Sequence, residues 1–258
     1  AAWEAPASSA APPDDVAREA PAIRFGNGLG GFSDDGREYV LSLGPDARTP
    51  APWSNVIANA GFGTLVTESG GGFTWAENSQ RHRITPWSND PVTDPVGEAL
   101  YLRDETRGGA WSLTPIPAGG DARYLVRHGQ GYTRFEHARA GLAQSLAVSV
   151  APDAPVKLLR VSLENRGPAR RVSLYAVVEW VLGASREASR VTVRTHWDAA
   201  RNALLATNAL SVFPQRHAFV VATEAVRDVT GDREEFFGEP GSRARPAALG
   251  RAGLSGRV

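Results

Sequence analysis

Aromatic and amide side chains are concentrated in one stretch of the sequence, between residues 49 and 104. The tetrapeptide Pro-Trp-Ser-Asn occurs there twice, at residues 52–55 and 86–89. Sugars present flat C–H faces fringed with hydroxyl groups, so aromatic rings beside amide, carboxylate and guanidinium groups suit their binding. The stretch is therefore a candidate carbohydrate-binding site. Its candidate residues are Trp53, Asn55, Asn59, Trp75, Asn78, Trp87, Asn89 and Asp90.

A structural interpretation of the same residues stays open. The tryptophans could fill a hydrophobic core, and the asparagines could support turns. Strand formation does not favour asparagine, so the asparagines of the repeated tetrapeptide are the hardest to explain in this way.

The segment 183–190 is a further candidate, because it interrupts two strongly apolar segments and carries Arg186 and Arg190. Arginine suits planar, bidentate contacts with polar ligands. The alternative is an ordinary exposed loop.

Carboxylates deserve separate consideration, because glycoside cleavage needs a protonated acid and often a second carboxylate across the bond. The aromatic stretch contains Glu68, Glu77, Asp90 and Asp94. The simpler interpretation is that these groups cap turns and pair with Arg81, Arg83 and Arg103. Sequence alone gives no distances between them.

Composition excludes several classes of protein. The 258 residues carry 28 basic and 28 acidic side chains, which argues against a nucleic-acid partner held by phosphate contacts. The absence of cysteine excludes disulfides and thiolate metal sites. The five histidines lack the i, i+4 spacing of a helical zinc site, so we expect no metal and no cofactor. No apolar run reaches 18 residues, and we expect no direct membrane contact.

The elements that position these residues are predicted to be strands. Residues 1–22 are rich in Ala, Pro and Ser and predict a linker, and residues 23–258 are expected to form one domain. Residues 63–68 and 73–78 predict two extended segments joined by a glycine turn. Further strands are expected at residues 39–43, 110–114, 122–128, 132–137, 146–150, 157–163, 172–180 and 191–197.

The fold class follows from this spacing. Short strands separated by Gly, Pro, Asn or Asp are typical of a large antiparallel β-sandwich, which makes the chain all-β. Two of the later strands are apolar on both faces for part of their length, which predicts that they are covered on both sides.

Several long motifs, in fixed order, carry a family resemblance. They lie at residues 52–59, 61–63, 68–79, 85–91, 97–104 and 128–134. Together they resemble the N-terminal β-domain of glycoside hydrolase family 94, which holds cellobiose and chitobiose phosphorylases. The strongest likeness is to the phosphorylase-like region of cyclic β-1,2-glucan synthases. The resemblance covers about residues 25–258 and implies a supersandwich of the galactose mutarotase-like kind.

The resemblance also implies how function is divided along the chain. In the family, the catalytic aspartate and the phosphate-binding groups lie in an (α/α)6 barrel that follows the β-domain. That barrel is expected after residue 258, so no catalytic residue is assigned here and the isolated chain is expected to be inactive. The implied role is non-catalytic: the domain would shape the acceptor side of the active-site cleft for a β-linked glucan and contact the barrel.

Two further implications concern assembly and location. The resemblance allows a homodimer in which the 183–190 loop reaches the active site of the partner. It also implies a cytoplasmic location, with the parent protein anchored in the inner membrane in the synthases.

Two other functions stay open at this point. One is a free-standing carbohydrate-binding module, which would bind glucan by itself. The other is a mutarotase-like epimerase, which would need His82 or His128 to converge with Glu77 in one cleft.

Overall fold

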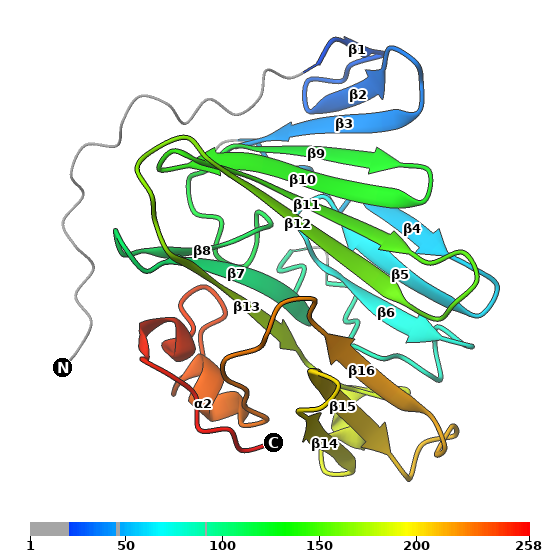
Figure 1. Cartoon of the computed structure of the whole chain (residues 1–258). Helices are drawn as coiled ribbons and strands as arrows, with labels where there is room; N and C mark the ends of the chain where they lie inside the picture. The colour runs from blue at the N-terminus through cyan, green and yellow to red at the C-terminus, as the bar shows by residue number, and fades with distance from the viewer. Residues whose placement is uncertain (1–20, 45–46, 91) are drawn as a thin grey trace.

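The chain folds into antiparallel sheets with few and short helices, as the computed structural model shows for residues 21–44, 47–90 and 92–258 (Figure 1). The predicted linker lies almost wholly outside these residues. The strands are β1 (Ile23–Arg24), β2 (Gly30–Ser33), β3 (Glu38–Leu43), β4 (Ser54–Ala58), β5 (Phe62–Thr67), β6 (Gly72–Ala76), β7 (Glu98–Asp104), β8 (Ala110–Ser112), β9 (Tyr124–Gly129), β10 (Tyr132–Arg139), β11 (Leu142–Val150), β12 (Lys157–Asn165), β13 (Val172–Val178), β14 (Val193–Asp198), β15 (Ala203–Asn208) and β16 (His217–Val221). The helical elements are α1 (Arg186–Ser189), α2 (Arg233–Phe237) and a 3-10 turn at Ala247–Gly250.

The described strands form four sheets. The largest has seven strands in the order β1-β2-β3-β9-β10-β11-β12. Three smaller sheets have the orders β13-β7-β8, β14-β15-β16 and β4-β5-β6. Every pairing between strands is antiparallel, which confirms the predicted fold class.

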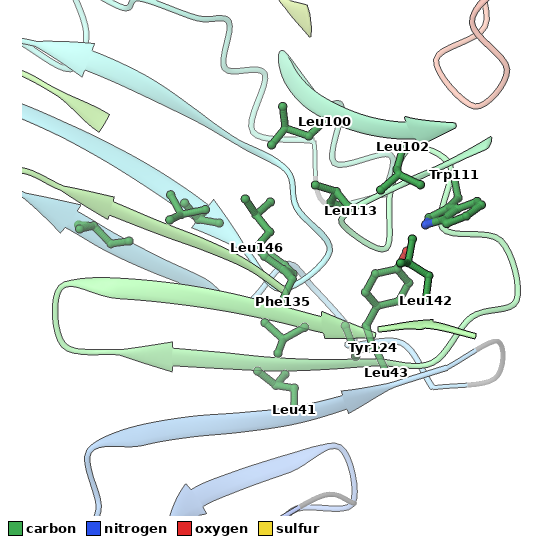
Figure 2. Close-up of a cluster of buried hydrophobic side chains, with 14 residues drawn as sticks. Leu41, Leu43, Leu100, Leu102, Trp111, Leu113, Tyr124, Phe135, Leu142 and Leu146 are labelled. Carbon is green, nitrogen blue, oxygen red and sulfur yellow. The ribbon is translucent and has the colours of Figure 1, made fainter. Parts of the chain in front are cut away.

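The main core is built by strict alternation along five strands of the large sheet. One row of cross-strand neighbours runs through Leu41, Val126, Phe135, Leu146 and Val161. Successive side chains of a strand point to opposite faces, so this row places all five on one face. Leucines of β7 and Trp111 of β8 pack against that face from the neighbouring sheet (Figure 2). Burial of apolar side chains from both sheets is the main stabilising contribution.

The predicted glycine turn is confirmed at the β5–β6 hairpin. Gly72 begins β6 with φ +130°, a conformation that side chains rarely adopt. A Cβ at this position would lie 1.9 Å from the carbonyl oxygen of Leu65. Only glycine fits, because the neighbouring strand passes directly over its Cα.

The prediction that two of the later strands are covered on both sides fails for β12 and β13, which both carry apolar residues on each face. β12 is the last strand of the large sheet, and β13 is the last strand of its own sheet. Leu158, Leu159 and Leu163 of β12 are 50%, 44% and 40% exposed, and Leu174 of β13 is 51% exposed. Apolar residues on both faces do not show whether a strand lies at the centre or at the edge of a sheet. The sequence pattern therefore predicted coverage that these two edge strands do not have.

One partly buried ion pair joins three of the sheets. Lys157 is the only lysine in the chain, and it begins β12. Its ammonium donates to Glu98 Oε2 of β7 at 2.8 Å, to Thr64 Oγ1 of β5 at 3.1 Å and to Thr74 Oγ1 of β6 at 3.3 Å. A compact ammonium with three donors suits this convergence better than a planar guanidinium.

The other carboxylate oxygen of Glu98 is also satisfied. Thr74 Oγ1 donates to Glu98 Oε1 at 2.6 Å, and Thr85 Oγ1 donates to the same atom at 2.8 Å. Burial acts to raise the pKa of Glu98, but the Lys157 charge and these hydroxyls hold it below its ordinary value. The ionised pair is therefore the native form.

Lys157→Met should lower the free energy of unfolding by about 1.5–3 kcal/mol at neutral pH, because it leaves a partly buried carboxylate without its cation. Lys157→Met/Glu98→Gln should recover more than half of that loss, because the amide is neutral and still accepts from the hydroxyls. Urea denaturation of the three proteins measures this. If Lys157→Met alone were as stable as the wild type, the prediction would be contradicted.

The pH dependence of this loss has a definite sign. The depressed pKa of Glu98 means that its stabilising contribution is complete above the unfolded pKa and is lost as pH falls through the folded one. In Lys157→Met the unpaired carboxylate is stabilised by protonation instead. The stability difference between wild type and variant should therefore shrink as pH falls from 7 towards 4, within the stable range of both.

Candidate functional site

A hollow of about 190 Å³ lies where the second tetrapeptide copy meets the 183–190 loop. Five separate segments of the chain contribute to it, including the residues that follow β13 and Arg243. The lining residues are Arg83, Pro86, Trp87, Ser88, Pro95, Val96, Gly97, Glu179, Val181, Ser185, Arg186, Glu187 and Arg243. Trp87 and Arg186, which sequence analysis proposed separately, therefore face one space.

An aromatic stack holds Trp87 in place. Its ring stacks on Phe73 of β6 with centroids 5.2 Å apart and planes 29° apart. Phe73 also contacts Trp75 at 5.1 Å, and the guanidinium of Arg83 lies 5.8 Å from the Phe73 ring centroid. Trp87 is only half-buried, so part of the indole remains available to a ligand.

Backbone hydrogen bonds fix the 183–190 loop beside this stack. Arg83 N–H donates to the Gly183 carbonyl at 2.9 Å, and Gly183 N–H donates back to the Arg83 carbonyl at 3.1 Å. The loop then makes the single turn of α1, whose N-cap Ser185 accepts from Ala188 N–H at 3.3 Å. These contacts place Arg186 at the rim of the hollow.

Glu179 lines the hollow and pairs with three arginines. Its carboxylate accepts from Arg243 at 2.8 Å, from Arg233 at 3.0 Å and from Arg186 at 3.4 Å, and its side chain is only 9% exposed. One carboxylate cannot occupy all the donors of three guanidinium groups. Arg186 and Arg243 line the hollow, and Glu187 adds a second carboxylate to the lining. The hollow therefore combines an aromatic ring with guanidinium and carboxylate groups, an arrangement that suits the hydroxyl groups of a ligand.

The two copies of the tetrapeptide have different structural roles. The Asn55 amide donates to the carbonyls of Gly129 and Tyr132, both at 2.9 Å, and to Thr133 Oγ1 at 3.2 Å. It ties β4 to the β9–β10 hairpin. Asn89 is exposed and has φ +45°, a left-handed conformation that asparagine tolerates well.

Three of the other proposed residues have structural contacts. Trp53 packs against the main core, with its ring centroid 5.9 Å from that of Tyr39. The Asn59 amide donates to the carbonyls of Ala151 at 2.8 Å and Ala154 at 2.9 Å. Trp75 lies over Gly63, where a Cβ would come within 2.4 Å of the indole.

The remaining proposed residues lie in turns or at the surface. Asn78 Oδ1 accepts from two backbone N–H groups of its own turn, at 2.9 and 2.8 Å. Asp90 Oδ1 accepts from the backbone N–H groups of Val92 at 2.9 Å and of Thr93 at 3.2 Å. A hydrogen bond from the Thr93 hydroxyl, together with these two backbone bonds, lowers the pKa of Asp90. Arg190 caps the end of α1 through its backbone and its side chain is exposed. None of these three residues is among those that line the hollow.

The four carboxylates of the aromatic stretch have partners other than the arginines predicted for them. Glu77 pairs with Arg216 at 2.9 Å. Asp94 accepts from Thr67 Oγ1 at 2.5 Å and from Ser69. Glu68 accepts from Thr49 and from Trp53 N–H at 2.7 Å, and burial raises its pKa. Because strands bring distant segments together, the nearest arginine in sequence was a poor guide.

Three residues that line the hollow, Arg83, Glu179 and Arg243, were not predicted as binding residues from the sequence. Arg83 appeared only as a pairing partner, and Arg243 lies more than 60 residues from Glu179, so no local signal joined them. Glu179 did carry a signal, since it is the only acid in the apolar run 172–182. A lone carboxylate in such a run needs a buried partner, which could have marked it.

The histidines proposed for an epimerase do not line the hollow. His82 stacks on Phe213 with centroids 4.3 Å apart, and burial lowers its pKa. His128 Nδ1 contacts Thr133 Oγ1 at 2.9 Å, and burial lowers its pKa to about 4. Both rings are therefore neutral near pH 7 and pack within the fold.

In the described part of the chain, no helix has the length and apolar character needed to cross a membrane.

Comparison with known proteins places this architecture in a family. Residues 37–258 match the family described as glycosyl hydrolase 94, supersandwich domain. The chain is 39% identical over 232 residues to the cyclic beta-(1,2)-glucan synthase NdvB of Rhizobium meliloti (strain 1021), covering 88% of this chain and 8% of that protein.

Two phosphorylases are also similar. The N,N'-diacetylchitobiose phosphorylase of Vibrio furnissii is 31% identical over 155 residues, 58% of this chain and 19% of that protein. The solabiose phosphorylase of Paenibacillus borealis is 28% identical over 247 residues, 88% of this chain and 30% of that protein. The chain thus spans at most 30% of the length of these three relatives. On this evidence the chain belongs to the supersandwich domains of glycoside hydrolase family 94.

Proposed function

We propose that this supersandwich domain shapes the acceptor side of the active-site cleft in a β-glucan phosphorylase or cyclic β-1,2-glucan synthase-type enzyme. The observation that carries the proposal is the convergence of Trp87 and Arg186 on one hollow, although almost 100 residues separate them. The domain would contribute binding and orientation, and the chemistry would belong to a barrel domain of the same protein.

The chemistry of the hollow supports a sugar as its ligand. The exposed part of Trp87 offers a flat apolar surface to the C–H face of a pyranose ring. Arg186 and Arg243, both engaged by Glu179, offer further N–H donors to hydroxyl oxygens. The hollow is small and open, which fits one side of a cleft that a second domain completes.

The surroundings of the hollow support a binding role over a catalytic one. Glu179, one of two carboxylates that line the hollow, accepts hydrogen bonds from three arginines. A carboxylate in that setting orients the guanidinium groups around it. We therefore assign no acid or base in glycoside chemistry to the described residues.

Arg186→Ala should raise the KM for the sugar acceptor about tenfold in the longer enzyme that carries this domain, with little change in kcat. The reason is that a donor to bound acceptor is lost equally in the ground and transition states. Steady-state kinetics with varied acceptor measures it. Arg190→Ala is the matched control, since it removes the same charge from the same loop outside the hollow. Equal effects of the two substitutions would contradict the proposal.

Trp87→Ala and Asn55→Ala should distinguish a binding role of the second tetrapeptide copy from a structural role of the first. Trp87→Ala should raise the acceptor KM several-fold because the sugar platform is lost. Asn55→Ala should leave KM unchanged but lower the free energy of unfolding by about 1–3 kcal/mol, because its carbonyl partners lose their donor. Urea denaturation and kinetics on both variants test this. If Trp87→Ala lost stability without any change in KM, its role would be packing alone.

A further inference from the structure

Arg83 lies in a short strip of backbone between β6 and the 183–190 loop. It forms isolated antiparallel bridges with Trp75 on one side and with Gly183 on the other. The next residue, Ile84, is bonded on both sides as well, to β6 at 2.8 Å and to the segment that leads into the loop at 2.9 Å. Main-chain hydrogen bonds therefore hold the backbone of Arg83 independently of its side chain.

The backbone around Trp87 lacks this support. Within the described part of the chain, residues 86–89 make no hydrogen bond with another backbone group. The described residues supply one hydrogen bond to this stretch, and it comes from a side chain, because Arg83 Nη1 donates to the Trp87 carbonyl at 3.4 Å. The position of Trp87 therefore depends on this bond and on the stacking of its ring on Phe73.

The Arg83 side chain has two further contacts, and one of them also concerns Trp87. Its Nε donates to the Ser79 carbonyl at 3.2 Å, which fixes the direction of the guanidinium. The guanidinium carbon lies 5.8 Å from the centroid of the Phe73 ring, a distance at which a cation is attracted to an aromatic ring. Phe73 is buried and is the ring on which Trp87 stacks. One guanidinium thus contacts both the carbonyl of Trp87 and the ring that supports its indole.

We propose that Arg83 is a positioning residue of the hollow, whose guanidinium sets the orientation in which Trp87 presents its indole to a sugar ring. The inference rests on the proposed sugar-binding function and adds how the aromatic platform is held in place. A guanidinium suits this task, because its planar fork donates in two directions while it remains charged. On this account Arg83 acts on the sugar through Trp87 and not by direct contact.

A double-mutant cycle in the longer enzyme that carries this domain separates positioning from direct contact. Arg83→Gln should raise the KM for the sugar acceptor about threefold with kcat nearly unchanged, because uniform binding is lost. In a Trp87→Ala background the same substitution should change KM by less than about 1.5-fold, because no indole is left to position. Steady-state kinetics with varied acceptor on the wild type, both single variants and the double variant measures this.

Arg81→Gln is the matched control, since Arg81 is exposed, lies two residues before Arg83 and does not line the hollow. It should leave the acceptor KM unchanged. Thermal unfolding of the two variants should give nearly the same midpoint, because main-chain bonds hold the backbone at position 83. Arg83→Lys keeps a cation near the Phe73 ring and the Trp87 carbonyl, so its KM should lie closer to that of the wild type than the KM of Arg83→Gln does.

The outcomes distinguish this inference from the proposed function on which it rests. Equal effects of Arg83→Gln with and without Trp87 would overturn the inference, because Arg83 would then contact the sugar directly. An unchanged KM in Arg83→Gln, with Trp87→Ala still raising KM, would overturn it and leave the sugar-binding role intact. If neither Trp87→Ala nor Arg83→Gln changed KM, the proposed function itself would fail, and the inference with it.

Discussion

The polar constraint at which three of the sheets meet is the ion pair between Lys157 and Glu98. Three sheets meet at this point, and each contributes a polar group to it: an ammonium from β12, a carboxylate from β7 and hydroxyls from β5 and β6. An ion pair taken out of water adds little net stability compared with apolar packing, but it is costly to break. Its geometry links three sheets at one point, in a chain that otherwise uses arginine for its basic side chains.

The same interaction positions the candidate site. Thr85, which donates to Glu98, also accepts from Thr74 N–H at 2.9 Å. Two residues later the chain reaches Trp87, whose ring rests on Phe73. Gly97, the residue before Glu98 in the sequence, lines the hollow. Its carbonyl accepts from Glu179 N–H at 2.8 Å. Trp87 follows Thr85, which binds Glu98, and Glu179 binds the backbone of Gly97, which precedes Glu98. The Lys157–Glu98 ion pair thus lies next to the segments that hold both residues of the hollow.

Much of the fold could be predicted because strands carry local signals, but the site depends on contacts that do not. Short apolar segments bounded by turn residues predicted most of the strands, and the glycine run predicted the β5–β6 turn. The roles of Asn55 and Asn89 differ although their tetrapeptides are identical, because Asn55 faces a neighbouring hairpin and Asn89 is exposed just before the turn that begins at Asp90. The partnership of Glu179 with Arg243 spans 64 residues, and only the packed sheets bring those groups together. The sequence therefore predicted Trp87 and Arg186 as binding residues, but it did not distinguish them from the other predicted residues that lie outside the hollow.

The central claim is that the hollow around Trp87 is one half of a sugar site, completed by a second domain. Calorimetric titration of the isolated 258-residue chain with linear β-1,2-glucan oligosaccharides, with cellobiose as control, tests it most directly. The account predicts no measurable heat from a well-folded sample. Clear binding in the micromolar to low-millimolar range, about −4 to −8 kcal/mol, would contradict it and identify a complete binding module.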